Sequence, residues 1–433
     1  MICYNMMNRV ELCHAIIATG GVIAVRKLLG ESHSIIMTTR INNLNKGKSP
    51  GRLAIFIYGL SGGGATRRTI TLAQAFVERG YLVDLIVLNP KGPLEDQVPA
   101  GVELVVLKSV GIRLAGALKW RARRNQISAA VPALSRYLRQ RRPNVLMSAA
   151  NHVHMSAAWA HRLAKVPVPL VLRVSTHLTR SIKGEGHHER PLRLWLARCL
   201  YGWADSIIAV ADGIAEDICE YTAVPKDRIF TIYNPTYTPD VSAKAAAPLD
   251  HPWFAPGQPP VLLGAGRFAA AKDYPTLLKA FARVRAQRPA RLIILGKGKR
   301  QADIIALAQQ LGVAGDVECP GDIDKPFRWM GRASVLGLSS AWEGFPGVLV
   351  EAMACGCPVV STDCPSGPIE ILDRGAYGRL VTPGDDEALS LAIQATLDAP
   401  RTSFRLQQRA TEFSVDRAVD KYLEVLLNTS CRS

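Results

Sequence analysis

The sequence lacks the features that mark membrane-spanning, secreted and zinc-binding proteins. No stretch of its 433 residues holds the roughly 20 uninterrupted apolar residues that a transmembrane helix needs. An apolar run near the N-terminus is preceded by Glu11, closed by Arg26 and Lys27, and lacks a convincing cleavage site, so it is a poor signal peptide. The nine cysteines show no paired C-x-x-C spacing, which argues against a zinc ribbon or a disulfide framework. We therefore expect a reducing, cytoplasmic compartment.

Acidic residues are scarce relative to basic ones. Lys and Arg number 53 and Asp and Glu 36, which gives a formal net charge of +17. This surplus indicates an anionic partner, namely a nucleic acid, a phosphorylated small molecule or an anionic membrane surface. Residues 111–143 contain many Arg and Lys and no acid, while Ile127, Val131, Leu134 and Leu138 fall at helical spacing. They predict an amphipathic basic helix.

Two interpretations of this basic helix remain open. It can lie on anionic lipid, or its charges can form the solvated face of a helix that packs on a sheet. Nucleic acid is a third option, but no pattern of aromatic residues for base stacking accompanies the charges. We expect no nucleic-acid partner.

The most informative stretch is 339–351, which reads SSAWEGFPGVLVE. The apolar run 333–339 predicts a buried strand and residues 348–354 predict a helix, so the turn between them follows a strand and opens a helix. Helix-start amides bind phosphate, and ligands of open α/β sheets gather at the carboxyl ends of strands. Glu343 and Glu351 lie about two helical turns apart, so both can face one cleft. The arrangement suits a nucleotide sugar.

Together with the following residues ACGCPVVSTDCPSGPIEIL, the pattern Glu343-x7-Glu351 resembles the signature of retaining glycosyltransferases of family 4. The text looks most like bacterial members that build polysaccharides and lipid-linked glycans. The resemblance implies an α/β fold of the GT-B type, with two Rossmann-like doubly wound domains facing a central cleft. It also implies a nucleoside diphosphate sugar donor, a glycan or lipid-linked acceptor, no cofactor, and no metal at the diphosphate.

The chain divides accordingly. We expect an N-terminal extension over 1–50, an acceptor-side domain over 51–235, a Pro- and Ala-rich linker over 236–260 and a nucleotide-sugar domain over 261–412. The resemblance implies that the last helix, in 413–433, crosses back onto the first domain. The extension is expected to be loosely ordered or to result from an overlong start, with Met37 as the alternative, and we assign it no function.

Two further strand–loop–helix junctions are suited to phosphate. The first is the glycine loop 59–64, because glycine lets the backbone approach a ligand closely. A Rossmann dinucleotide site is its rival, but the glycines are contiguous rather than spaced G-x-G-x-x-G. The loop resembles the family's GGGAER type, with Thr66 replacing the usual Glu. At the second junction, Arg267 and Lys272 flank the turn, and the resemblance implies that they bind the diphosphate.

Histidines follow the predicted strand 145–148. The resemblance implies that a histidine near this point contacts the transferred sugar, and His152 and His154 qualify equally, with His177 a weaker candidate. His187 and His188 lack a third metal ligand at sensible spacing. The motif Asp322-x-Asp324 lies after the wrong strand for a metal site.

These considerations predict five catalytic residues: Arg267, Lys272, Glu343, His152 and His154. The predicted donor-binding residues occupy loops and helix starts that follow strands: Gly63, Gly64, Gly266, Arg267, Lys272, Gly298, Ile323, Glu343, Phe345, Gly347, Val348, Leu349 and Glu351. We expect a metal-independent retaining transfer of a hexose or N-acetylhexosamine, with UDP the favoured nucleotide, at the inner face of the cell membrane. A nucleotide-sugar epimerase of the same fold and a non-catalytic basic membrane-binding protein are the alternatives.

Overall fold

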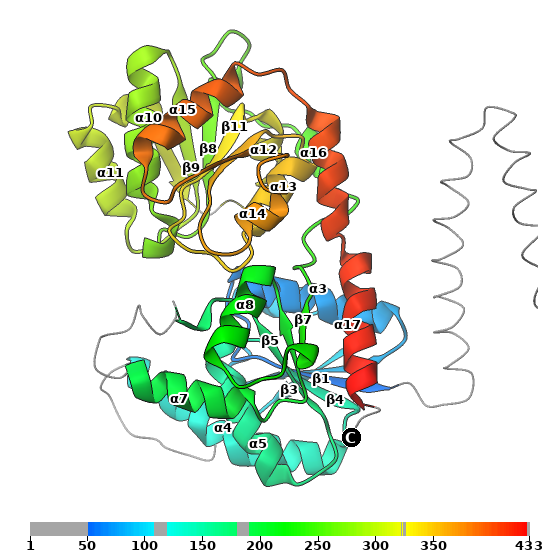
Figure 1. The fold of residues 1–433 in the computed structure, drawn as a ribbon. Coiled ribbons are helices and arrows are strands. Elements are labelled where there is room, and N and C mark those ends of the chain that lie inside the picture. Colours follow the sequence, from blue (N-terminus) through cyan, green and yellow to red (C-terminus); the bar gives the residue numbers. More distant parts are fainter. Residues whose placement is uncertain (1–50, 108–118, 180–189, 322, 324–325, 431–433) are drawn as a thin grey trace, which may run out of the picture. The chain divides into compact units, whose positions relative to one another are not determined.

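The computed structural model describes residues 51–107, 119–179, 190–321, 323 and 326–430. The expected N-terminal extension, His187, His188, Asp322 and Asp324 lie outside these residues. Both α/β domains belong to one unit, Arg52–Ser433. Helices and strands alternate along it, as Figure 1 shows.

The N-terminal domain is built on a seven-stranded parallel sheet of order β3-β2-β1-β4-β5-β6-β7. Its strands are short and apolar: β1 (Arg52–Phe56), β2 (Leu82–Val87), β3 (Val102–Val106), β4 (Val145–Ser148), β5 (Leu170–Val174), β6 (Ser206–Ala209) and β7 (Ile229–Thr231). The helices are α3 (Gly64–Glu78), α4 (Lys119–Arg141), α5 (His154–Ala164), α7 (Arg190–Tyr201) and α8 (Asp212–Tyr221). Helices on both faces of a parallel sheet bury both, which explains the continuous hydrophobic runs of the strands.

Strand alternation sends side chains to two separate cores in this domain. Leu53 and Ile55 point to one face, where α3 and the C-terminal helix α17 (Val415–Ser430) pack. Ala54 and Phe56 point to the other face, which α4, α5, α7 and α8 cover. Successive residues of a strand face opposite sides, so β1 contributes side chains to both cores.

The C-terminal domain repeats this architecture with a six-stranded parallel sheet of order β10-β9-β8-β11-β12-β13. Its strands are β8 (Val261–Ala265), β9 (Arg291–Leu295), β10 (Val317–Gly321), β11 (Val335–Leu338), β12 (Val359–Thr362) and β13 (Arg379–Val381). Its helices are α10 (Tyr274–Gln287), α11 (Gln301–Gln310), α12 (Phe327–Arg332), α13 (Gly347–Ala354), α14 (Pro368–Ile371), α15 (Asp386–Leu397) and α16 (Ser403–Ala410). The prediction of two doubly wound Rossmann-like domains is confirmed.

Two segments outside the sheets join the domains. The stretch expected to be an irregular linker contains a short helix, α9 (Val241–Ala246), which packs against α12 and α13. Helix α17 packs against α3 and β4 of the N-terminal domain. Its Tyr422 is fully buried there, and the hydroxyl accepts a 2.8 Å hydrogen bond from Nε of Arg173. No helix among the described residues is long and apolar enough to cross a bilayer.

Candidate active site

The strand orders determine where ligands can gather. In each sheet the first strand lies between the second and the fourth, so β1 is flanked by β2 and β4, and β8 by β9 and β11. The chain leaves such neighbouring strands toward opposite faces, and the crevice outside their carboxyl ends is the usual ligand site of open α/β sheets. The loops that follow β1, β4, β8 and β11 carry the glycine loop, His152, Arg267 and Glu343, respectively.

Lys272 and Glu343 meet at the carboxyl end of the second sheet. The distance between Lys272 Nζ and Glu343 Oε1 is 2.6 Å, although the residues are 71 positions apart. The Ser340 hydroxyl donates to the same oxygen at 2.6 Å, and the Ser339 hydroxyl donates to the Lys272 carbonyl at 2.9 Å. The side chains of Lys272 and Glu343 are only 19% and 14% exposed. Two predicted site residues are thus held in a fixed, partly desolvated geometry.

The loop after β8 needs glycine. Gly266 has φ +148°, and a Cβ there would lie 2.9 Å from Lys272 Cε. A Cβ on Gly298 would lie 2.6 Å from the Phe268 carbonyl oxygen, because the loops after β8 and β9 run side by side. Arg267 is exposed in this loop. Gly266 therefore adjoins Lys272, and Gly298 adjoins Phe268, the residue that follows Arg267.

The start of α13 contacts Arg68, a residue of the N-terminal domain. Gly347 is the first residue of α13, and a Cβ on it would lie 3.2 Å from Nη2 of Arg68 in α3. One turn further along α13, Glu351 accepts a hydrogen bond from the same Nη2. Sequence reasoning missed Arg68. Its position one turn after the glycine loop was the available signal, but nothing in the sequence indicated a partner 283 positions away.

The other predicted donor-binding residues are placed as follows. Gly63 and Gly64 form the N-cap and first residue of α3, and a Cβ on either would meet no atom within 4 Å. Val348 is half-buried and Leu349 fully buried in the first turn of α13, and the Leu349 amide donates to the Pro346 carbonyl at 3.0 Å. Ile323 is half-buried against the core.

Phe345 packs between the domains. Its ring stacks on Tyr233 from the N-terminal domain, with centroids 5.5 Å apart and an interplanar angle of 24°. Phe413 lies against both rings. The Phe345 side chain, 8% exposed, is therefore committed to the interdomain contact, and a donor could meet only the backbone of this residue.

Gly344 lies very close to the backbone of the N-terminal domain. A Cβ on it would lie 2.0 Å from the carbonyl oxygen of Ser175, which follows β5. Only glycine allows this approach, because real Cβ atoms essentially never come so close to another atom.

Glu370 adds a polar contact between the domains. Its carboxylate accepts from the amides of Asp212 at 2.8 Å and Gly213 at 3.2 Å, in the first turn of α8. Burial raises the pKa of Glu370, although three backbone N–H donors oppose the shift. The contact neutralises part of the positive end of the α8 dipole. Sequence reasoning missed this residue as well.

The structure distinguishes the candidate histidines. His152 is exposed beyond β4, with its ring edge-on to Tyr58, 5.8 Å between centroids. His154 points into the core, where Nδ1 lies 2.8 Å from the Ser148 hydroxyl. Burial, with a smaller effect of His152, lowers the pKa of His154 to about 3, although a hydrogen bond to the Arg173 backbone opposes the shift. His154 is thus a neutral core residue, and His152 is the one available to a ligand.

His177 is buried beside Asp217, in the loop after β5. It lies 3.5 Å from Asp217, which also accepts from the Leu178 amide at 2.6 Å and the Thr179 hydroxyl at 2.5 Å. Burial alone would raise the pKa of Asp217, but these hydrogen bonds hold it below its usual value. Asp217 therefore fixes the loop after β5.

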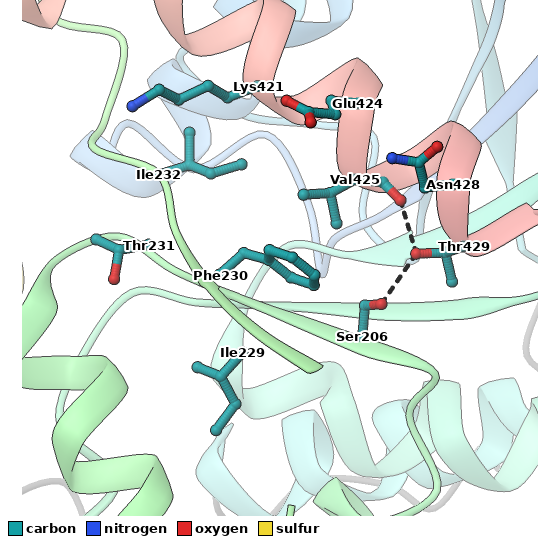
Figure 2. Close-up of a pocket in the computed structure, with 10 residues that line it drawn as sticks. All are labelled: Ser206, Ile229, Phe230, Thr231, Ile232, Lys421, Glu424, Val425, Asn428 and Thr429. Carbon is teal, nitrogen blue, oxygen red and sulfur yellow. Dashed lines mark hydrogen bonds between the residues drawn. The ribbon is translucent and has the colours of Figure 1, made fainter. Parts of the chain in front are cut away.

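A separate pocket of about 450 Å³ lies between β7 and α17, and Figure 2 shows its lining. Phe230, Val425 and Lys421 line it, and the hydroxyls of Ser206 and Thr429 lie 2.9 Å apart at one side. It contains none of the predicted site residues.

Among the described residues no group of three or more His, Cys, Asp or Glu could hold a metal ion. Burial raises the pKa of Cys355, Cys357 and Cys364 to about 12, so these thiols stay protonated.

Comparisons with known proteins agree with this arrangement. The family described as Glycosyltransferase Family 4 matches residues 62–238, and the family described as Glycosyl transferases group 1 matches 249–413. A Campylobacter jejuni enzyme, N-acetylgalactosamine-N,N'-diacetylbacillosaminyl-diphospho-undecaprenol 4-alpha-N-acetylgalactosaminyltransferase, is 26% identical over 80% of this chain and 90% of its own. The Rhizobium meliloti lipopolysaccharide core biosynthesis glycosyltransferase LpsE is 33% identical over 51% of this chain and 64% of its own.

Solved structures share the fold. HepE from Anabaena, crystallised in complex with UDP and glucose, matches with a TM-score of 0.69 and 20% identity over 87% of this chain and 100% of its own. One family matches the N-terminal domain and the other matches the C-terminal domain. The chain therefore belongs to the glycosyltransferases of the GT-B fold, with a family 4 domain followed by a group 1 domain.

Proposed function

We propose that this glycosyltransferase moves a hexose or N-acetylhexosamine from a UDP-sugar, with retention of configuration, to a hydroxyl of a lipid-linked or polysaccharide acceptor. The observation that carries the proposal is the convergence of Lys272, Glu343 and Arg267 on the carboxyl ends of β8 and β11. The acceptor side would lie in residues 51–235, the linker in 236–260 and the donor site in 261–412. The helix in 413–433 would return to the first domain.

The chemical problem is the leaving group. Breaking the bond between sugar and nucleotide places negative charge on the diphosphate, so groups preorganised around that charge lower the barrier. Arg267, Lys272 and the Val348 amide at the start of α13 would supply them. The amides of Gly347 and Leu349 would join them on leaving the Phe345 and Pro346 carbonyls, to which they now donate. Because these groups provide the positive charge themselves, we propose that the transfer needs no metal ion.

The two glutamates bind hydroxyls. Glu351 would hold the ribose, and Arg68 would then exchange its present partner for the donor's phosphates. Glu343 would hold hydroxyls of the donor sugar, while Lys272 keeps its carboxylate oriented. Gly63, Gly64, Gly266, Gly298 and the Phe345 backbone would line the donor, with Ile323 near the base.

Retention would follow from attack on the same face. Glu343 is held by Lys272 and Ser340, which leaves it poorly disposed to attack the anomeric carbon. The acceptor hydroxyl would instead approach from the side on which the diphosphate departs and lose its proton to it. His152 would contact the transferred sugar from the N-terminal domain.

The relatives support the choice of substrates. The HepE structure contains UDP, and the name of the Campylobacter relative specifies an acceptor linked through diphosphate to undecaprenol. An acceptor of that kind would place the protein on the inner face of the cell membrane. Membership in the glycosyltransferases favours transfer over the epimerase and over a binding protein without catalysis.

Incubation with UDP-hexoses and UDP-N-acetylhexosamines, with undecaprenyl-diphosphate-linked sugars as acceptors, tests the proposal. The expected result is a glycosidic product with the donor's anomeric configuration, formed with a chelator present. A donor converted to its epimer without any acceptor would overturn the proposal.

A further inference from the structure

Helix α5 exposes a line of large apolar side chains. Met155, Trp159 and Leu163 are spaced four residues apart, which places them on one face of the helix. Their exposed fractions are 49%, 50% and 51%. Large side chains in line and half in water are uncommon on a soluble surface and mark an interaction site. We call these three residues the α5 stripe.

Aromatic and cationic groups extend the stripe. Trp203, which follows α7, packs edge-on to Trp159 with 5.0 Å between centroids. The guanidinium of Arg162 lies 4.7 Å from the Trp203 ring centroid. Trp195 is 59% exposed on α7, which packs against α5 on the same side of the sheet, as Figure 1 shows.

Acidic residues are scarce near the stripe, although Asp205, two positions after Trp203, is exposed. Between Glu103 and Glu185 the sequence contains no Asp or Glu, and α4, which packs against α5, belongs to this segment. Arg162 and Lys165 are exposed beside the stripe, and Arg198 is exposed on α7. An apolar stripe with an excess of positive charge around it complements an anionic surface.

We propose that the α5 stripe inserts into the interfacial layer of an anionic bilayer, with Trp203, Trp195 and the neighbouring cations at the headgroups. The inference rests on the proposed function, because a lipid-linked acceptor would be presented at that surface. Tryptophan and arginine are favoured at the boundary between hydrocarbon and water. A second copy of the chain is a poorer occupant, because both copies would bring the same positive charge to the contact.

Vesicle flotation of the full chain tests the proposal. The wild type and the double variant Trp159→Ser/Leu163→Ser are compared on vesicles of phosphatidylcholine alone and of equal parts phosphatidylcholine and phosphatidylglycerol. The matched control is Phe404→Ser, which removes an aromatic ring that is 80% exposed on α16 of the other domain. The expected result is selective binding of the wild type to the anionic vesicles and a loss of roughly tenfold or more in the stripe variant only.

Three results would overturn the proposal. They are equal binding by the stripe variant, an equal loss in the Phe404→Ser control, and a wild-type dimer in light scattering that the stripe variant converts to monomer. UDP-induced thermal stabilisation is measured on the same samples. If it is absent from the wild type while the stripe-dependent vesicle binding persists, the proposed function fails and the membrane surface stands.

Discussion

Four charged side chains hold the candidate site in place before any ligand arrives. The pairs Lys272–Glu343 and Arg68–Glu351 are partly shielded from water, with side chains 14% to 21% exposed. Such pairs add little to stability, because desolvation and side-chain ordering offset the attraction. Their value is positional, since each ion pair holds a glutamate side chain in one orientation.

The sequence could predict the placement of Lys272, Glu343 and Glu351, because the first two follow recognisable strands and Glu351 lies in the helix that comes next. It could not show which of His152 and His154 is exposed, because side chains two positions apart at a helix start can point to opposite sides. It also could not show that Phe345 packs against Tyr233 and Phe413, which requires knowledge of domain contacts.

The burial of His154 predicts an acid sensitivity. Its pKa is near 3 in the folded state against about 6.5 when unfolded, so between these values the unfolded chain binds the extra proton. The stabilising contribution is therefore complete above about pH 6.5 and falls as the pH decreases. Between about pH 7 and pH 5 it amounts to roughly 2 kcal/mol of unfolding free energy.

Urea unfolding of wild type and His154→Gln at both pH values measures this effect. Gln keeps a hydrogen-bonding group near Ser148 but cannot titrate. The variant should lose about 2 kcal/mol less stability than the wild type on acidification. Equal losses in both proteins would refute the assignment of His154 as a buried neutral residue.

At the scale of elements, loops and helix starts form the contact between the domains. The turn after β11 approaches Ser175, α13 meets α3 through Arg68, and Glu370 binds the start of α8. The pattern of strands and helices indicated which turns carry the site. Their partners could not be predicted, because a contact between turns far apart in sequence depends on how the domains meet.

Gly344 provides a test of this contact. Gly344→Ala should force the turn away from the Ser175 carbonyl, which a Cβ would approach to 2.0 Å. We expect a loss of about 1–3 kcal/mol in thermal stability from overpacking, and a lower transfer rate.

Gly315→Ala is the matched control for Gly344→Ala. Gly315 lies outside the site, and a Cβ there would meet no atom within 4 Å. Its substitution should be neutral or slightly stabilising, because alanine restricts the unfolded chain. If calorimetry showed both variants equally stable, the close approach at Gly344 would be refuted.

At the scale of the whole molecule, two sheets that share one order over six strands are joined by a linker and the returning helix α17. Short buried strands alternating with helices made the doubly wound architecture predictable. Helix α9 was not predictable, because six residues in a Pro- and Ala-rich stretch form a helix only through packing against α12 and α13.

The most direct test of the central claim is thermal stabilisation of the full chain by UDP, GDP, ADP and dTDP. At a hundredfold excess over Kd, a site present only in the folded state adds about 2.7 kcal/mol. We predict stabilisation by UDP that is lost in Arg267→Ala and in Glu351→Ala. It should persist in Arg417→Ala, which removes an exposed cation from α17. A UDP response unchanged in Arg267→Ala and Glu351→Ala, or no response to any of the four nucleotides, would contradict the account.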